Sequence, residues 1–142
     1  MLVAPSEKLE AVVPNGELIA IVDDDLPVRE SLRRLMRSVG YTAEVFSLAD
    51  DFLAFPRLDE TACLIGDICM PSMTGLELYQ RLVETGHPIP TILITAYPDD
   101  AVRTRALSEG VICYLQKPFH ENDLMRCVSK ALERGNSRED NS

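Results

Sequence analysis

The chain has 142 residues, of which 46% are hydrophobic and 26% are charged, and its formal net charge is −9 at pH 7. A chain of this length and composition is expected to fold as one globular domain. The negative charge and the absence of a basic stripe argue against a nucleic-acid-binding surface, so we expect no direct contact of this chain with DNA or RNA.

The pattern of apolar residues argues against two further classes of protein. No apolar run approaches the length of a membrane span, and the N-terminus lacks the features of a signal peptide, so we expect a cytoplasmic protein without membrane contact. The four cysteines are scattered without a C-x-x-C pair, at Cys63, Cys69, Cys113 and Cys127. We expect them to be reduced, most of them in the core, and we expect neither a disulfide nor a zinc site.

The chain begins with a segment that has no periodicity and continues with a strand and a helix. Residues 1–16 contain two prolines and are expected to form a flexible N-terminal arm. Residues 18–22 are an apolar run typical of a buried strand. Apolar residues then recur at helical spacing over 28–39, and Gly40 is expected to end this helix. The arginines of the same segment are interpreted as a solvated surface.

The next two units follow the same alternation. Residues 41–46 alternate between apolar and polar side chains, which predicts a strand near an edge of the sheet. Ser47 is expected to cap a short helix that Pro56 ends. Residues 62–66 predict the central strand, and apolar residues over 76–83 predict the helix that follows it.

The last part of the chain predicts two more strands and two more helices. The strands are expected at 91–94 and 111–115. The helix expected at 99–109 has acids in its first turn and a thin apolar side, so it should be weakly anchored. A final helix carries apolar residues over 124–132, and 135–142 are expected to form a frayed polar tail or the start of a linker.

Five strands that alternate with five helices are typical of an α/β protein. We therefore predict a single-domain (βα)5 fold over 17–134, with a doubly wound, five-stranded parallel sheet and right-handed crossovers. In open sheets of this kind the ligand site lies beyond the carboxyl ends of the strands.

Polar residues lie at the carboxyl ends of four of the predicted strands. In the order of the strands they are Asp23 with Asp24, Asp67, Thr95 and Lys117. Two like charges about 4 Å apart repel by roughly 4 kcal/mol at an effective dielectric constant of about 20, so the three acids should bind a proton or a cation. Ligands that are all oxygen favour Mg²⁺ or Mn²⁺.

A magnesium ion held by few carboxylates usually binds a phosphoryl group as well. Lys117 would then supply a positive charge and Thr95 a hydroxyl donor to the phosphoryl oxygens. A carboxylate can itself accept the phosphoryl group as an acyl phosphate. Each residue alone also has an ordinary explanation: the acidic triplet as a helix cap, Thr95 as a strand-end hydroxyl, and Lys117 as a surface lysine with a buried stem.

Four motifs in the expected order carry a family resemblance that covers about residues 17–134. They are Ile21-Val22-Asp23-Asp24-Asp25, then Asp67-Ile68-Cys69-Met70-Pro71-Ser72-Met73-Thr74-Gly75, then Leu93-Ile94-Thr95-Ala96, and Tyr114-Leu115-Gln116-Lys117-Pro118-Phe119. The chain resembles the receiver domain of a two-component response regulator, and the sequences of its motifs are most similar to those of FixJ-like receivers. The resemblance implies a flavodoxin-like (CheY-like) sheet with strand order 2-1-3-4-5.

The resemblance also implies a role for each site residue. Asp67 would be the phosphoacceptor, and its phosphoryl group would come from a sensor histidine kinase or a histidine phosphotransfer protein. Asp24, Asp67 and the backbone carbonyl of Cys69 would bind Mg²⁺, with Asp23 assisting through water. Thr95 and Lys117 would contact the phosphoryl oxygens, and the Lys117–Pro118 peptide bond would be cis.

Further implications concern signalling and timing. Thr95 and Tyr114 would act as the switch, remodelling a face made by helix 99–109, strand 111–115 and the last helix. Helix 99–109 and strand 111–115 are also a possible homodimer interface by resemblance. Cys69 and Tyr97 lie at positions that tune the lifetime of the acyl phosphate. An output domain is not expected in this chain, because only a short polar segment follows residue 134.

Two other functions remain as alternatives. A phosphatase of the haloacid-dehalogenase type also uses an aspartate nucleophile, but it needs a D-x-D-x-T pattern after the first strand. Here Asp23 is followed by Asp24-Asp25-Leu26-Pro27. A degenerate receiver that only binds partners is disfavoured by the complete set of acids, threonine and lysine. We therefore expect a phosphorylation-controlled switch and not an enzyme.

Overall fold

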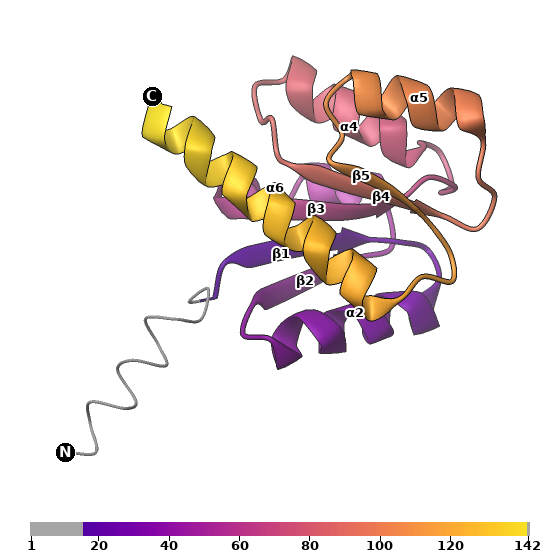
Figure 1. Ribbon diagram of the computed structural model, residues 1–142, viewed down its shortest axis with the longest axis horizontal. Coiled ribbons are helices and arrows are strands. Elements are labelled where there is room, and N and C mark those ends of the chain that lie inside the picture. The colour runs from indigo at the N-terminus through magenta and orange to yellow at the C-terminus, as the bar shows by residue number, and fades with distance from the viewer. Residues whose placement is uncertain (1–15, 142) are drawn as a thin grey trace.

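The core of the protein is a five-stranded parallel sheet, and a computed structural model describes residues 16–141 (Figure 1). The strands are β1 (Leu18–Val22), β2 (Thr42–Phe46), β3 (Thr61–Asp67), β4 (Thr91–Thr95) and β5 (Cys113–Gln116). Their order in the sheet is β2-β1-β3-β4-β5. The predicted α/β fold and strand order are therefore confirmed, and β2 lies at an edge as its alternating sequence indicated.

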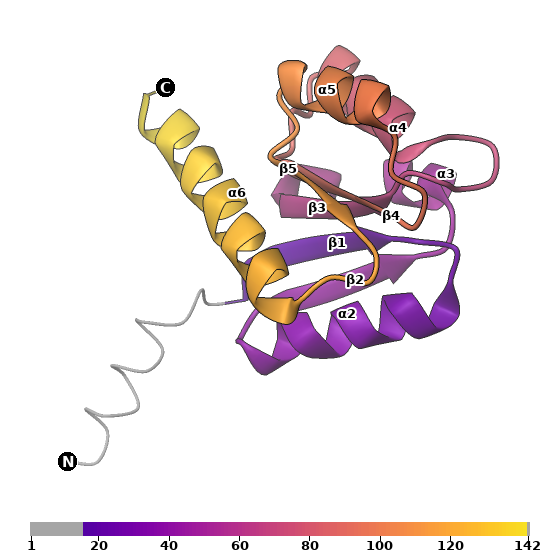
Figure 2. The ribbon, with the colours of Figure 1, turned by 45° about the vertical axis from the view of Figure 1, so that its right-hand side comes forward.

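The helices cover both faces of the sheet (Figure 2). They are α2 (Leu26–Ser38), α3 (Ala49–Leu53), α4 (Gly75–Glu84), α5 (Asp100–Ser108) and α6 (Glu121–Asn141), with a 3-10 turn at Leu58–Glu60. Apolar residues of α2 and α6 pack on one face of the sheet, and those of α3, α4 and α5 pack on the other. None of the helices in the described residues has both the length and the apolar character needed to cross a membrane.

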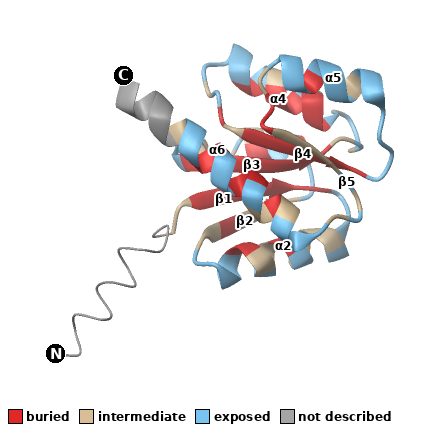
Figure 3. Ribbon diagram, in the orientation of Figure 1, coloured by how far each residue is buried: buried red, intermediate tan, exposed pale blue. Residues whose placement is uncertain are grey.

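Burial follows the position of each strand in the sheet (Figure 3). All residues of β1 and β4 are buried, because these strands lie inside the sheet and are covered on both faces. The edge strands β2 and β5 are mostly half-buried. The apolar interior therefore supports the strand ends in the middle of the sheet, from which the polar residues of the predicted site emerge.

Two predicted element boundaries were wrong. The short helix α3 begins at Ala49 with Leu48 in the N-cap position, so Ser47 is not its cap. The last helix continues to Asn141, through the segment 135–141 that we expected to be frayed, because this segment lacks a proline and its one glycine weakens a helix without ending it. The predicted N-terminal arm, apart from Gly16, lies outside the described residues.

The prediction that all cysteines are reduced was also wrong. Cys113 in β5 and Cys127 in α6 form a disulfide, and their Cα atoms are 6.1 Å apart. The sequence hid this pair because its members are 14 residues apart in different elements and meet only when α6 packs back across the sheet. Cys63 is a buried free cysteine, as expected, and Cys69 is exposed.

We expect thiol titrations of protein purified without reductant to distinguish the disulfide, the buried thiol and the exposed thiol. Cys69 should react with an aromatic disulfide reagent at once, whereas Cys63 should react only after unfolding, because burial raises the pKa of its thiol to about 12. Denatured protein should then show two thiols, and reduced protein four. Reduction should also lower the free energy of unfolding by about 3 kcal/mol. Four reactive thiols in denatured protein that was never reduced would contradict the disulfide.

Candidate functional site

Three carboxylates gather at the carboxyl ends of β1 and β3. These strands are neighbours with Val22 opposite Gly66, so Asp23 and Asp67 leave the sheet side by side. Oxygen atoms of Asp23, Asp24 and Asp67 all lie within 4.8 Å of one another. Asp23 is fully buried and Asp67 is 5% exposed, whereas Asp24 is exposed to solvent. The three acids that the sequence singled out are thus brought together.

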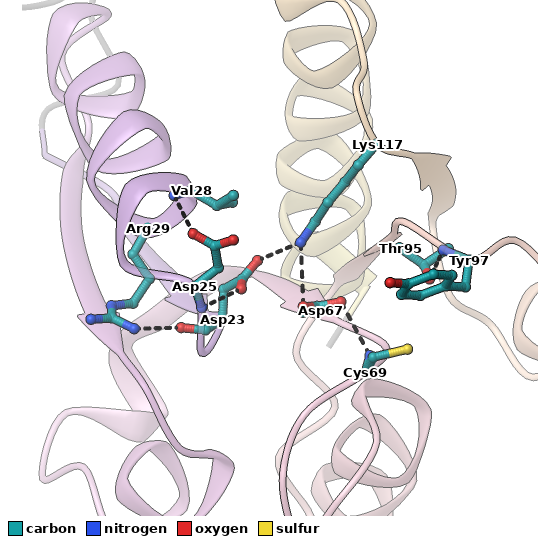
Figure 4. A network of polar contacts seen from close by, with 9 residues as sticks. All are labelled: Asp23, Asp25, Val28, Arg29, Asp67, Cys69, Thr95, Tyr97 and Lys117. Atoms are coloured by element: carbon teal, nitrogen blue, oxygen red, sulfur yellow. Dashed lines mark hydrogen bonds and ion pairs between the residues drawn. The ribbon is translucent and has the colours of Figure 1, made fainter.

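Lys117 reaches these carboxylates from the end of β5 (Figure 4). Its Nζ atom donates to Asp23 Oδ2 at 3.0 Å and to Asp67 Oδ2 at 3.3 Å. The backbone N–H of Lys117 donates to the carbonyl of Thr95 at 2.7 Å, and the following peptide bond to Pro118 is cis, as the resemblance implied. The lysine therefore bridges two buried acids and is not a surface lysine.

The loop that carries the acidic triplet is held by its own side chains and by α2. Asp23 Oδ1 accepts from the N–H of Asp25 at 2.9 Å, and Asp25 Oδ1 caps α2 by accepting from Val28 N–H at 3.3 Å. Arg29 Nη1 donates to the carbonyl of Asp23 at 2.8 Å. The interpretation of all the α2 arginines as solvated surface was therefore wrong for Arg29, which contacts the acidic loop.

The ionisation of Asp67 is shaped by its surroundings. Burial raises the pKa of the Asp67 carboxyl, and the negative charge of Asp23 raises it further. The N–H of Cys69 and the ammonium of Lys117 act in the opposite direction without cancelling this rise. For Lys117, burial alone would lower the pKa, but its hydrogen bonds and ion pairs with Asp23 and Asp67 produce a net rise. The ammonium therefore stays protonated between the two acids.

Because the pKa of Asp67 is higher in the folded than in the unfolded protein, ionising this carboxyl costs folding free energy. The cost is absent at low pH, where the group is protonated in both states, and grows as the pH rises through the folded pKa. We therefore expect Asp67→Asn to raise the melting temperature of metal-free protein at pH 7, with the gain vanishing in acid. Thermal melts across pH measure this, and a lower melting temperature at pH 7 would contradict it.

Of the remaining predicted residues, Cys69 contacts Asp67, whereas Thr95, Tyr97 and Tyr114 make their contacts at the ends of β4 and α5. Cys69 is exposed, and its N–H donates to Asp67 Oδ1 at 3.1 Å. Thr95 is buried at the end of β4, and its Oγ1 accepts from the N–H of Tyr97 at 3.0 Å. The Tyr97 side chain is 76% exposed. Tyr114 is half-buried on β5, and its hydroxyl accepts from the N–H of Asp99, the N-cap residue of α5, at 3.2 Å.

Helix α5 packs on the sheet through few apolar residues, as its thin apolar side predicted. It buries Ala106, and most of its other residues are exposed. At its C-terminal end, the hydroxyl of Tyr79 donates to the carbonyl of Glu109 at 2.9 Å, and the Glu109 carboxylate pairs with Gln80 and Arg105. At its N-terminal end, Tyr114 makes the contact with Asp99. A residue of β5 thus touches the end of α5 that lies nearer the acids.

Two features of the site were not predicted from the sequence: the contact of Arg29 with the acidic loop and the close approach of Gly75 to Asp67. A Cβ atom on Gly75 would lie 2.5 Å from the backbone oxygen of Asp67, so the start of α4 approaches the acceptor strand as closely as glycine permits. The N–H of Gly75 donates to the carbonyl of Ile68 at 3.1 Å, which holds this approach in place. The position of Arg29 one helical turn after the acidic triplet was the available signal for its role.

The donor set fits a small, hard divalent cation. Neighbouring and opposite ligands of octahedral Mg²⁺ are about 3–4 Å apart, because its bonds measure roughly 2.0–2.1 Å. The oxygen atoms of Asp23, Asp24 and Asp67 all lie within 4.8 Å of one another, an upper limit a little above this spacing. Carboxylates are ligands for Mg²⁺ or Mn²⁺, and the exposure of Asp24 leaves room for waters in the coordination shell.

Comparisons with known proteins agree with this geometry. The family model of the response regulator receiver domain matches residues 19–129, which include every site residue discussed above. The response regulator protein TmoT of Ectopseudomonas mendocina is 38% identical over 125 residues, covering 88% of this chain and 57% of TmoT. The transcriptional regulatory protein FixJ of Rhizobium meliloti is 32% identical over 115 residues, covering 81% of this chain and 56% of FixJ.

A solved structure of a response regulator is also similar to this chain. The low-resolution structure of the response regulator StyR superposes with a TM-score of 0.81 at 38% identity, covering 87% of this chain and 62% of StyR. The chain therefore spans little more than half the length of the curated relatives it matches. The predicted similarity to FixJ-like receivers is confirmed.

Proposed function

This chain belongs to the family of response regulator receiver domains of two-component systems, and from this premise we propose that it accepts a phosphoryl group from a histidine kinase on Asp67 in a Mg²⁺-dependent reaction. Receiver domains are signalling domains that interact with histidine kinases. The observation that carries the proposal is the position of the Asp67 carboxylate between the ammonium of Lys117 and the N–H of Cys69, beside a second buried acid.

The transfer exchanges one bond to phosphorus for another. A carboxylate oxygen of Asp67 forms the new bond to phosphorus, the bond between phosphorus and the histidine nitrogen breaks, and the nitrogen retains the electron pair. Lys117 is close enough to Asp67 to place a positive charge on a phosphoryl oxygen. Asp23, Asp24, Asp67 and the carbonyl of Cys69 would hold Mg²⁺, which neutralises charge on the phosphoryl group when bound.

The buried state of Asp23 disfavours the phosphatase alternative. A nucleophile at the end of the first strand would need to be reached by a phosphodonor, but Asp23 is fully buried, whereas Asp67 keeps 5% of its surface exposed. Asp67 is also flanked by a loop whose residue Cys69 is exposed, so a phosphodonor can approach it from solvent. The geometry therefore favours Asp67 as the acceptor.

We infer that the output is a change of the face formed by α5, β5 and α6. Thr95 would move toward the phosphoryl group and give up its contact with the N–H of Tyr97, and Tyr114 would give up its contact with Asp99. The sparse burial of α5 supports this inference, because a helix with few apolar contacts needs little free energy to shift. A homodimer through α5 and β5, and the rate-tuning roles of Cys69 and Tyr97, are part of the same proposal.

The experiment that tests the proposal is intact-mass analysis after incubation with acetyl phosphate and Mg²⁺. Wild-type protein should gain the mass of one phosphoryl group, and acid-labile labelling should be lost on removal of Mg²⁺ with EDTA. Asp67→Asn should gain nothing, whereas the control Asp51→Asn, in the exposed first turn of α3, should label like wild type. Undiminished labelling of the Asp67→Asn variant would place the acceptor elsewhere.

A further inference from the structure

Arg29 joins helix α2 to the acidic loop by two contacts. Its guanidinium turns back from the second turn of the helix, and Nη1 donates to the carbonyl of Asp23 at 2.8 Å (Figure 4). Its backbone N–H donates to the carbonyl of Asp25 at 3.0 Å. The Arg29 side chain is half-buried, and Asp23 is fully buried. Arg29 therefore contacts both ends of the acidic triplet, Asp25 through the first backbone hydrogen bond of the helix and Asp23 through its side chain.

The hydrogen bonds of Asp23 show how the contact with Arg29 fixes the orientation of the Asp23 carboxylate. Its N–H donates to the carbonyl of Phe46 at 3.1 Å, its carbonyl accepts from Arg29, and its Oδ1 accepts from the N–H of Asp25. These three contacts fix the backbone and one carboxylate oxygen, which leaves Oδ2 directed at Lys117. Without Arg29 the buried carbonyl of Asp23 loses a charge-assisted donor, and the peptide plane that precedes Asp24 is free to turn.

We propose that Arg29 is a positioning residue for the divalent cation site, because it orients the peptide between Asp23 and Asp24 and thereby aims both carboxylates at Asp67. The proposal rests on the proposed function in one respect, namely that these acids bind a cation. It extends the set of site residues to a side chain that touches neither the cation nor the phosphoryl group.

An electrostatic role and a positioning role of Arg29 predict opposite changes in metal affinity when the residue is replaced. A guanidinium that contacts the backbone of the acidic loop adds positive charge near the cation site, so electrostatics alone predicts that removing Arg29 tightens metal binding. Loss of orientation predicts weaker binding instead, and residues that orient metal ligands typically cost about 10- to 100-fold in affinity when replaced. The sign of the change therefore separates a positioning role from a purely electrostatic one.

The test is the dissociation constant for Mn²⁺, obtained from the electron paramagnetic resonance signal of the free ion. Arg29→Gln should bind Mn²⁺ about 10- to 100-fold more weakly than wild type. Arg29→Lys keeps the charge and one donor, so it should recover part of the affinity. The control Arg34→Gln removes the same charge from an exposed position of α2 and should bind like wild type.

Binding of Mn²⁺ by Arg29→Gln that is as tight as in wild type, or tighter, would overturn the proposal. Thermal melts without metal show whether each variant folds. If Arg29→Gln does not fold, Arg29→Met, which keeps the aliphatic stem without a donor, decides instead, and an affinity equal to or tighter than wild type would overturn the proposal. Wild-type protein that fails to bind Mn²⁺ would contradict the proposed function itself, so the two failures are distinguishable.

Discussion

Replacing Lys117 with glutamine should slow phosphorylation of Asp67 by about 100- to 1,000-fold, the usual cost of removing one donor that stabilises a developing negative charge. Lys117 Nζ lies 3.3 Å from Asp67 Oδ2, so the same ammonium is placed to contact a phosphoryl oxygen bound there. Initial rates of mass gain with acetyl phosphate measure the effect. The control is Lys130→Gln, which removes an exposed lysine of α6 and should label at the wild-type rate.

The same substitution should destabilise the metal-free protein. It leaves the buried carboxylates of Asp23 and Asp67 facing each other without their shared cation. Removing one partner of a buried ion pair costs about 3 kcal/mol or more, so the loss of stability should be large at neutral pH. Mg²⁺ should restore part of it, because a bound dication replaces the missing positive charge.

The pH dependence of the Lys117→Gln variant follows from Asp67. Lys117 lowers the pKa of this carboxyl, so its removal moves an already raised pKa further upward. The variant should therefore regain stability as the pH falls toward that pKa, where Asp67 takes up a proton and the repulsion from Asp23 disappears. Denaturant melts from neutral to acidic pH test this. Equal stability of variant and wild type at neutral pH without metal would contradict the buried ion pair.

Replacing Gly75 with alanine should lower the free energy of unfolding by about 2 kcal/mol, the typical cost of adding a methyl group to a site without space. The new Cβ would lie 2.5 Å from the backbone oxygen of Asp67 and 3.0 Å from Leu93 Cδ2. A backbone atom cannot move to another rotamer, so either α4 or the end of β3 has to shift. This outcome runs against helix propensity, by which alanine is favoured over glycine by up to about 1 kcal/mol.

Because the shift moves Asp67 itself, Gly75→Ala should also weaken Mn²⁺ binding and labelling by acetyl phosphate. Gly66→Ala is the matched control, since Gly66 is the buried residue directly before Asp67. Its Cβ would lie 3.8 Å from Leu93 Cδ2, an ordinary contact, so this variant should be neutral or more stable by up to about 1 kcal/mol. Wild-type stability and labelling of Gly75→Ala would contradict the close approach of α4 to the acceptor strand.

The candidate site was predictable from the sequence to the extent that it lies at strand ends. In a parallel sheet all carboxyl ends lie at one edge, so acids that follow β1 and β3 and a lysine that follows β5 had to share that edge. Which atoms meet there was not predictable. The ion pairs of Lys117 with two acids depend on the path of the chain from β5 through Pro118, and periodicity carries no information on that path.

By itself, the sequence determined the fold class, the edge of the sheet that carries the polar residues, and the weak anchoring of α5, because each of these is recorded in the local pattern of apolar residues. Only the tertiary structure decided that Cys113 meets Cys127, that Arg29 holds the acidic loop, and that Gly75 touches the backbone of Asp67. These contacts join segments whose separation is set by how helices pack on the sheet. A difference of a few ångströms in that packing makes or removes each contact and leaves the pattern of apolar residues unchanged.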